Sequence, residues 1–331
     1  MSEFRTIREL CSVVVDCPHS TPKWTANGKI VIRNKNIKHG KIDFSSPSYT
    51  DDEHFAQRIK RAKPQPGDII ITREAPIGDV GMIPENTECC LGQRMVLLRA
   101  NQSVCDNFYL LYSLQSLYVQ HQISWSEGTG TTVSNLRIPH LEQIQIPYLP
   151  LEQQSKISSV LRALEEKIEN NRRLNDYLQQ QAAALFSSLY DRTNTEVRFT
   201  DLIQILGGGT PKTGENTYWN GNIAFFTPKD VGTPYTLITE KTITEEGLSH
   251  CNSRLYPVNT VFVTARGTVG KVGMSGVPMA MNQSCYALVG KETHQLLVYF
   301  YTLKAVDRLK HKASGAVFDA ITTRDFESEQ I

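Results

Sequence analysis

The sequence has no long hydrophobic run and no segment of signal-peptide type. No uninterrupted apolar stretch reaches the roughly 18 residues that a membrane-spanning helix needs, and residues 1–5 do not begin a secretion signal. The seven cysteines are odd in number and include no Cys-x-x-Cys pair, while Cys89 and Cys90 are adjacent. This is a poor arrangement for disulfides or a shared metal. These absences predict a cytoplasmic protein whose thiols are reduced and mostly buried.

The motifs of the common enzymes are missing as well. The sequence contains no Asn-Pro-Pro-Tyr-like methyltransferase motif and no glycine-rich cofactor loop, and residues 267–271 lack the spacing and the Ser or Thr of a phosphate-binding loop. The eight histidines include no pair at metal-ligand spacing. We therefore expect a non-enzymatic chain that has no catalytic residues, no metal site and no cofactor of its own.

Strong overall charge is also absent, since the net charge is +1 over 331 residues. Local charge differs, because residues 23–41 carry six basic side chains and no acidic one. A positive face of this kind can contact phosphates, although a solvated lysine-rich surface is the more common explanation. With 40% apolar residues, the chain is long enough for two folded domains.

The sequence repeats itself. Residues 69–82 and 261–274 each read as a strand, a turn and a second strand, and a threonine, two glycines and a methionine coincide at one constant offset. Further landmarks follow in the same order: Thr21-Pro22-Lys23 and Thr210-Pro211-Lys212, Lys35-Asn36-Ile37 and Lys229-Asp230-Val231, Gln93 and Gln283, and Gly130 and Gly315 after a helix-like segment. We interpret the glycine pairs of the two strand–turn–strand segments, Gly78 with Gly81 and Gly270 with Gly273, as turn or bulge positions where a side chain would not fit.

One long helix is predicted between the two copies. From Leu151 to about Tyr190 there is neither glycine nor proline, and a seven-residue pattern continues over about five heptads. Its seam positions include Ile157, Leu161, Leu164, Ile168, Asn171, Asn175, Leu178, Leu185 and Leu189. The two asparagines would weaken the seam but select its register and partner. At 1.5 Å per residue the helix is about 60 Å long, so its seam requires a second helix.

The second copy stops near the point where the first copy enters this helix. Residues 141–147 of the first copy correspond to residues 325–331 of the second. A natural truncation, a subunit completed by another polypeptide and a trimmed chain would all explain this. Self-association of two copies through Leu161, Leu164, Ile168 and Leu178 is a further hypothesis.

The order of domain, helix and domain resembles the specificity subunit of type I restriction–modification systems. The passage Leu141-Glu142-Gln143-Ile144-Gln145-Ile146-Pro147-Tyr148-Leu149-Pro150-Leu151-Glu152-Gln153-Gln154 is similar to the one that leads from that family's first target-recognition domain into its first conserved helix. The resemblance implies two domains that each read half of a split DNA site. It also implies a helical ruler, adenine methyltransferase subunits that use S-adenosylmethionine, and a translocating restriction subunit. The family's second conserved helix is missing here.

The resulting fold prediction is α+β, with two tandem target-recognition domains of mixed strands and helices. Their expected bounds are 1–150 and 193–331, and the coiled-coil-forming spacer helix occupies 151–192. The helix length would limit the separation of the two domains to roughly 17 base pairs. A coiled-coil scaffold whose two heads bind proteins or peptides remains the alternative.

Candidate DNA contacts are basic and amide side chains. Phosphate contacts fix register, whereas arginine can bridge guanine and glutamine can bridge adenine. The candidates are Lys23, Arg33, Lys35, Arg73, Gln93 and Arg94 in the first domain, and Lys212, Lys229, Arg266, Lys271 and Gln283 in the second. We expect Arg73 and Arg266 to contact DNA, because both lie in the repeated strand pair.

Overall fold

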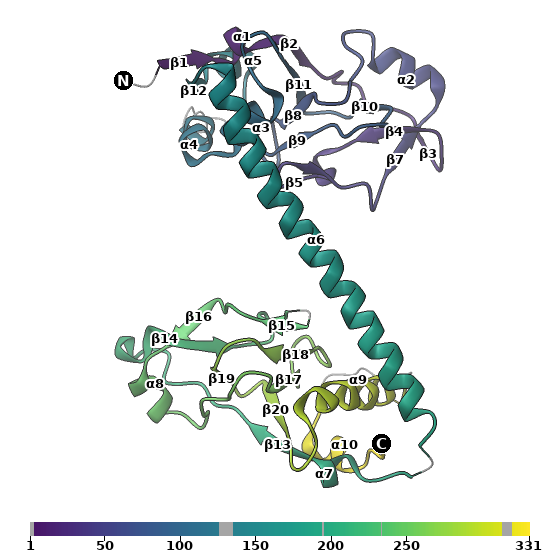
Figure 1. Cartoon of the computed structure of the whole chain (residues 1–331), viewed down its shortest axis with the longest axis vertical. Helices are drawn as coiled ribbons and strands as arrows, with labels where there is room; N and C mark the ends of the chain where they lie inside the picture. The colour runs from purple at the N-terminus through teal and green to yellow at the C-terminus, as the bar shows by residue number, and fades with distance from the viewer. Residues whose placement is uncertain (1–2, 126–134, 194, 233, 313–319) are drawn as a thin grey trace. The chain divides into compact units, whose positions relative to one another are not determined.

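The computed structural model describes residues 3–125, 135–193, 195–232, 234–312 and 320–331 (Figure 1). The chain forms two compact units, unit 1 (Met1–Arg173) and unit 2 (Leu174–Ile331). The boundary between them falls inside the long helix α6 (Leu151–Tyr190). The domain bounds 1–150, 151–192 and 193–331 therefore stay predictions, and the landmarks Gly130 and Gly315 lie outside the described residues.

Unit 1 combines two four-stranded sheets with short helices. One sheet has the order β2-β11-β8-β9 and the other β10-β4-β7-β3. The elements are β1 (Glu3–Thr6), α1 (Ile7–Leu10), β2 (Cys11–Asp16), β3 (Trp24–Thr25), β4 (Lys29–Ile32), β5 (Ile37–Lys38), β6 (Lys41–Ile42), β7 (Ser48–Thr50), α2 (Asp52–Arg58), β8 (Ile69–Thr72), β9 (Val80–Met82), β10 (Cys89–Leu91), β11 (Met95–Ala100), α3 (Asn107–Gln115), α4 (Leu117–Trp125), α5 (Ile138–Gln143) and β12 (Gln145–Tyr148).

Unit 2 repeats this plan. Its sheets have the orders β13-β20-β17-β18-β15 and β16-β14-β19. The elements are α7 (Phe199–Leu202), β13 (Ile203–Gly207), β14 (Trp219–Phe226), β15 (Tyr235–Thr236), β16 (Lys241–Ile243), α8 (Glu245–Ser249), β17 (Val261–Thr264), β18 (Val272–Ser275), β19 (Met279–Met281), β20 (Cys285–Gly290), α9 (Gln295–Lys312) and α10 (Thr323–Glu327).

Strand registers confirm the duplication. Ile69 pairs with Met82 in unit 1, and Val261 pairs with Met274 in unit 2. In the second sheet, β10 runs parallel to β4 and β19 runs parallel to β14. The same hydrogen-bonding pattern is therefore built from two different sets of apolar residues, and the predicted α+β class with a long intervening helix is confirmed.

The repeated glycines serve the backbone, as the sequence suggested. Gly78 and Gly270 have φ of +82° and +74°, a left-handed conformation that side chains with a Cβ rarely adopt. A Cβ on Gly81 would lie 3.1 Å from the carbonyl oxygen of Lys41, and one on Gly273 would lie 3.2 Å from that of Gly232. Both hairpins therefore require a sharp turn, followed by close contact with a neighbouring segment.

The helix α6 contacts unit 1 through polar residues. Gln154 accepts a hydrogen bond from the backbone N–H of Asp106 (2.8 Å), and Ser158 donates to the Asp106 carboxylate (2.6 Å). Further along, the Arg162 guanidinium lies 4.1 Å from the centre of the Phe108 ring. These contacts follow one face of the helix. The seam residue Leu161 is half-buried, whereas Ile157, Leu164 and Ile168 are exposed.

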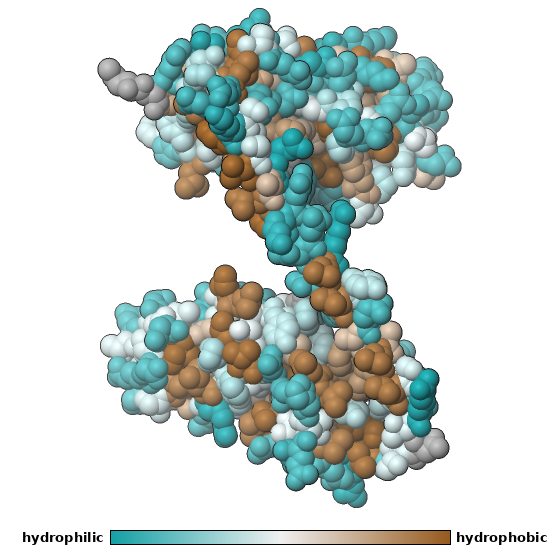
Figure 2. Space-filling view, viewed as in Figure 1, coloured by the Kyte–Doolittle hydropathy of each residue, from teal (hydrophilic) through white to brown (hydrophobic). Residues whose placement is uncertain are grey.

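In unit 2 the last turns of α6 pack on α9 (Figure 1). Phe186 is buried and stacks on Phe300 at 5.1 Å between ring centres, and Arg308 donates to the hydroxyl of Tyr190 (3.0 Å). Figure 2 shows hydrophobic residues at the surface of the middle part of α6. The exposed seam residues of the whole helix include Ile157, Leu164, Ile168, Leu178, Leu185 and Leu189.

The structure shows the state of the cysteines and whether any helix could cross a membrane. All seven cysteines are unpaired thiols, and five of them are buried, as expected. Burial raises the pKa of Cys89 to about 12 and that of Cys90 to about 11, which disfavours the reactive thiolate. Within the described ranges, no helix is both long enough and apolar enough to cross a membrane.

Candidate nucleic-acid interface

The loop of the repeated hairpin has the same internal hydrogen bonds in both units. The Thr72 hydroxyl accepts from the N–H of Asp79, and the Thr264 hydroxyl accepts from that of Lys271, at 2.9 Å in each case. The N–H groups of Gly78 and Gly270 donate to the carbonyl oxygens of the same threonines. The loops thus share one backbone frame, and their functional difference must come from the side chains they carry.

The Thr-Pro-Lys loop and the repeated glutamine meet beside this hairpin. Gln93 donates to the Thr21 hydroxyl (3.3 Å) and to the carbonyl oxygen of His19. In unit 2, Thr210 donates to Gln283. Landmarks more than 70 residues apart in the sequence therefore come together in both units. This convergence defines one edge of each unit, which we call the loop edge.

A cavity of about 350 Å³ opens at the loop edge of unit 1. Four of the six predicted DNA-binding residues of this unit line it, together with Trp24, whose ring lies 4.9 Å from the Arg33 guanidinium. The full lining is Pro22, Trp24, Arg33, Asn34, Lys35, Ala75, Gly92, Gln93 and Arg94. A fifth candidate, Lys23, is exposed next to Pro22 in the sequence, and its Nζ lies 3.7 Å from a carboxylate oxygen of Asp51. The cavity therefore concentrates positive charge beside an exposed aromatic ring.

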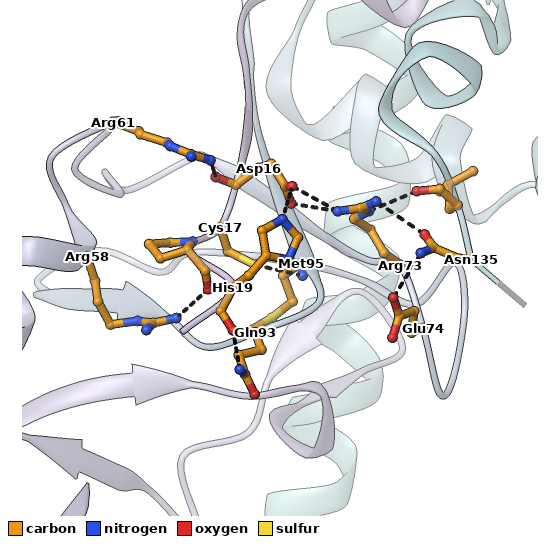
Figure 3. A network of polar contacts seen from close by, with 12 residues as sticks. Asp16, Cys17, His19, Arg58, Arg61, Arg73, Glu74, Gln93, Met95 and Asn135 are labelled. Atoms are coloured by element: carbon orange, nitrogen blue, oxygen red, sulfur yellow. Dashed lines mark hydrogen bonds and ion pairs between the residues drawn. The ribbon is translucent and has the colours of Figure 1, made fainter. Parts of the chain in front are cut away.

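Arg73 has a different environment (Figure 3). It is only 8% exposed, and its Nη1 donates to both carboxylate oxygens of Asp16 at 2.9 Å. Its Nε donates to the carbonyl oxygen of Leu136 (2.9 Å), and its Nη2 to Asn135 (3.2 Å). This placement does not support the direct DNA contact predicted for Arg73. Its guanidinium is committed to joining β8, β2 and the chain at residues 135–136.

A second buried arginine was missed by sequence reasoning. Arg58 donates to the carbonyl oxygens of Pro18 (3.0 Å), Ser20 (2.8 Å) and Leu91 (2.6 Å), as Figure 3 shows in part. These bonds hold the loop after β2 against β10 and so position the Thr-Pro-Lys segment. Burial lowers the pKa of Arg58. Its only sequence signal is its position in the last turn of a short helix, which also fits an exposed arginine.

The candidates of unit 2 are all exposed: Lys212, Lys229, Arg266, Lys271 and Gln283. Lys229 lies 3.5 Å from Glu240. Thr268 of the hairpin loop donates to the carbonyl oxygen of Pro228 (3.4 Å), which ties this loop to the segment that carries Lys229. The sequence-predicted residues of unit 2 therefore surround the same loop edge as those of unit 1.

One basic side chain occupies a different position in the two loop edges. The N–H of Arg73 donates to the carbonyl oxygen of Arg94, and the N–H of Ala265 donates to that of Ser284, at 2.8 Å in each case. By this correspondence Arg94 is replaced by Ser284, and the acidic Glu74 of the hairpin loop is replaced by Arg266. The two units therefore offer different chemistry on one shared frame. Among the described residues no three His, Cys, Asp or Glu side chains gather as a metal site would require.

Comparison with known proteins gives a consistent result. The type I restriction modification DNA specificity domain matches residues 3–180 and again residues 192–331. The putative type I restriction enzyme MjaX specificity subunit of Methanocaldococcus jannaschii is 21% identical over 359 residues, covering 99% of this chain and 82% of that protein. The MjaIX specificity subunit of the same organism is 31% identical over 127 residues, which span 37% of this chain and only 29% of the relative.

A solved structure shares the fold. The type I restriction–modification S subunit from M. genitalium aligns with a TM-score of 0.60 and 16% identity, covering 100% of this chain and 84% of that one. Two matches of the domain profile, one for each copy of the duplicated frame, together account for nearly the whole chain. The chain therefore belongs to the type I restriction–modification DNA specificity family, and it is a specificity subunit with two recognition domains in tandem.

Proposed function

We propose that each unit reads one half of a bipartite DNA site through its loop edge. The observation that carries this proposal is the convergence of three loops at the same edge of the duplicated sheet, with exposed basic side chains at that edge in both units. Arginine, lysine and amide groups suit phosphates and base edges. The proposed contacts are Lys23, Arg33, Lys35, Gln93 and Arg94 of unit 1, and Lys212, Lys229, Arg266, Lys271 and Gln283 of unit 2.

The chemistry of the complex would belong to other subunits. We infer that the chain docks adenine methyltransferase subunits, which would bind S-adenosylmethionine, and a translocating restriction subunit, all in the cytoplasm. Family membership supports this division of labour. In this proposal the chain itself has no catalytic role, and α6 acts as the spacer between the two half-sites.

We also infer that the exposed seam of α6 pairs with a helix of another polypeptide, which could be a second copy of this chain. Two observations support this pairing. The contacts of α6 with unit 1 use Gln154, Ser158 and Arg162, whereas the seam residues Leu164 and Ile168 on another face are exposed. In unit 2 an apolar cavity of about 580 Å³ opens between the end of α6 and α9, where a further helix could continue the core.

Replacing Leu164 and Ile168 together by aspartate tests the pairing. Each charge would have to be buried in the seam, which costs several kcal/mol without a partner. If the chain self-associates, multi-angle light scattering at micromolar concentration should show a dimer that becomes a monomer in the double variant. A monomer for the unmodified chain would exclude self-association. Co-purification of a helical partner from the native host, lost in the double variant, would then identify heterologous pairing.

DNA reading is tested by selection from a random 40-base-pair duplex library with the full-length chain, alone and with the subunits that co-purify with it. We expect two short invariant blocks separated by a gap of constant length, and an affinity that falls steeply with salt because bound phosphates release counterions. The absence of any enriched block, with or without the partners, would contradict the proposal. It would favour the alternative of a scaffold that binds proteins or peptides.

A further inference from the structure

Arg94 is held by an acidic neighbour at the mouth of the unit 1 cavity. Its Nε lies 3.1 Å from a carboxylate oxygen of Glu74, whereas Arg33 and Lys35 have no such ion pair within the described parts of the chain. The Arg94 side chain is 56% exposed and that of Glu74 only 23% exposed. The pair thus joins an accessible cation to a largely covered anion, beside a surface that we propose binds a polyanion.

Glu74 is itself fixed from two sides. Asn135 donates to its second carboxylate oxygen (2.9 Å), and Asn34 donates to its backbone carbonyl oxygen (2.6 Å). Asn34 belongs to the cavity lining, and its Oδ1 is the one buried side-chain polar atom of the described residues that has no hydrogen-bond partner. Asn135 therefore anchors the Glu74 carboxylate and Asn34 anchors the Glu74 backbone, while the Asn34 side chain keeps one unsatisfied acceptor.

The backbone at Arg94 is also defined. Its φ of +66° lies in the left-handed region, which disfavours residues with a Cβ. The conformation is held because the carbonyl oxygen of Arg94 accepts from Arg73 (2.8 Å) and the neighbouring Gly92 donates to Ile32 (2.7 Å). Strained positions of this kind collect at functional sites. The backbone of Arg94 is therefore fixed, and the ion pair with Glu74 restricts the orientation of its guanidinium.

We propose that Glu74 is a positioning residue that makes Arg94 a reader of guanine, an inference that rests on the DNA-reading function proposed above. The carboxylate contacts Nε and leaves the Nη1–Nη2 fork, which makes no hydrogen bond to another described residue, available for the O6 and N7 acceptors of one guanine. The same carboxylate repels a phosphate that approaches the fork. Glu74 thus orients the arginine for a base edge and opposes sequence-independent contacts.

Among its described residues, unit 2 has no counterpart of the Glu74–Arg94 ion pair. Arg266 replaces Glu74, and Ser284 replaces Arg94 at the equivalent positions. We therefore expect an arginine positioned by a neighbouring carboxylate to read guanine in one half-site only. This asymmetry makes the test internal to each DNA duplex, because guanines in the other half-site serve as controls.

The experiment measures fluorescence anisotropy with the duplex obtained by selection, with copies in which single guanines are replaced by 7-deazaguanine, and with a scrambled duplex. For the unmodified chain, one guanine in the unit 1 half-site should cost about tenfold in affinity when its N7 is removed. Glu74→Gln should reduce this penalty to less than about twofold and should tighten binding to the scrambled duplex by about fivefold near 0.15 M salt, as one added phosphate contact would.

Glu142→Gln is the matched control. The Arg8–Glu142 pair has the same N–O distance of 3.1 Å and similar exposure, 66% and 25%, but neither residue belongs to the cavity lining. We expect this variant to keep the full 7-deazaguanine penalty. Arg94→Lys keeps the charge without the fork, so it should lose the penalty while its binding to the scrambled duplex stays within about twofold.

The outcomes separate two failures. If the unmodified chain, with or without its partners, selects no site, the proposed function fails and this inference fails with it. If a site is selected but Glu74→Gln keeps the same 7-deazaguanine penalty as Glu142→Gln, Glu74 has no positioning role and only the inference is overturned. A penalty lost in both glutamine variants would also overturn it, because a loss of charge anywhere would then suffice.

Discussion

Replacement of Arg73 by alanine should destabilise unit 1 without removing a DNA contact. The guanidinium makes two hydrogen bonds to the Asp16 carboxylate and one to the carbonyl oxygen of Leu136, each at 2.9 Å. The two side chains are 10% and 18% exposed, and breaking one partner of a buried ion pair costs about 3–5 kcal/mol. Because Asp16 retains some water and a contact with His19 at 2.9 Å, we expect about 3 kcal/mol.

Urea unfolding of the full chain measures this loss. With an m-value of about 2 kcal/mol per molar urea, the midpoint of the unit 1 transition should fall by about 1.5 M. The transition of unit 2 provides an internal reference. The matched variant is Arg266→Ala, because Arg266 is exposed and forms no ion pair among the described residues, so its unfolding free energy should change by no more than about 0.5 kcal/mol.

DNA binding should separate the same two variants in the opposite sense. Arg266→Ala should weaken binding and reduce the salt dependence by about one phosphate contact. Arg73→Ala, measured where unit 1 is still folded, should retain the salt dependence of the unmodified chain. Equal unfolding midpoints for the two variants would refute the structural role of Arg73 in joining β8, β2 and the chain at residues 135–136. A shallower salt dependence for Arg73→Ala would restore it as a DNA contact.

Two further perturbations test an ion-pair cluster of unit 1 and the hairpin of unit 2. Hydrogen bonds from Lys29 and Lys63 hold the pKa of the Glu88 carboxyl at about 2, below its ordinary 4.5, so their stabilising effect is complete above about pH 4.5 and is lost as the pH falls towards 2. The thermal unfolding midpoint of Glu88→Gln should accordingly lie below that of the unmodified chain at pH 6, and the two midpoints should converge at pH 2. A difference in midpoint that stays constant with pH would contradict the stabilising role assigned to Glu88. Gly270→Ala places a Cβ 2.6 Å from the Cε of Lys310 at a φ of +74°, so it should lower the free energy of unfolding by about 2 kcal/mol. Gly267→Ala, at a φ of +81° with nothing within 4 Å of its Cβ, should lower it by only about 1 kcal/mol. Equal urea midpoints for the two variants would show that the contact with α9 does not matter.

Several of these residues were placed correctly by sequence because their signals are local or repeated. A hairpin whose threonine, glycines and methionine recur at one offset must reuse one backbone frame, and the strand registers agree. The long helix was predictable because no glycine or proline interrupts it and its apolar residues keep a seven-residue period. The sequence shows that Thr21 and Gln93 recur as Thr210 and Gln283, but it does not show that the threonine and the glutamine of each unit form a hydrogen bond.

The roles of individual charges were decided by the tertiary structure alone. Arg73 and Arg266 look alike in the sequence, yet the first is buried against Asp16 and the second is exposed. Sequence reasoning treated each basic residue by its charge, whereas burial and the position of the nearest carboxylate determine whether that charge holds the fold or faces a ligand. Those carboxylates come from strands and loops far away in the chain, as Asp16 does for Arg73, and only folding brings them within hydrogen-bonding distance.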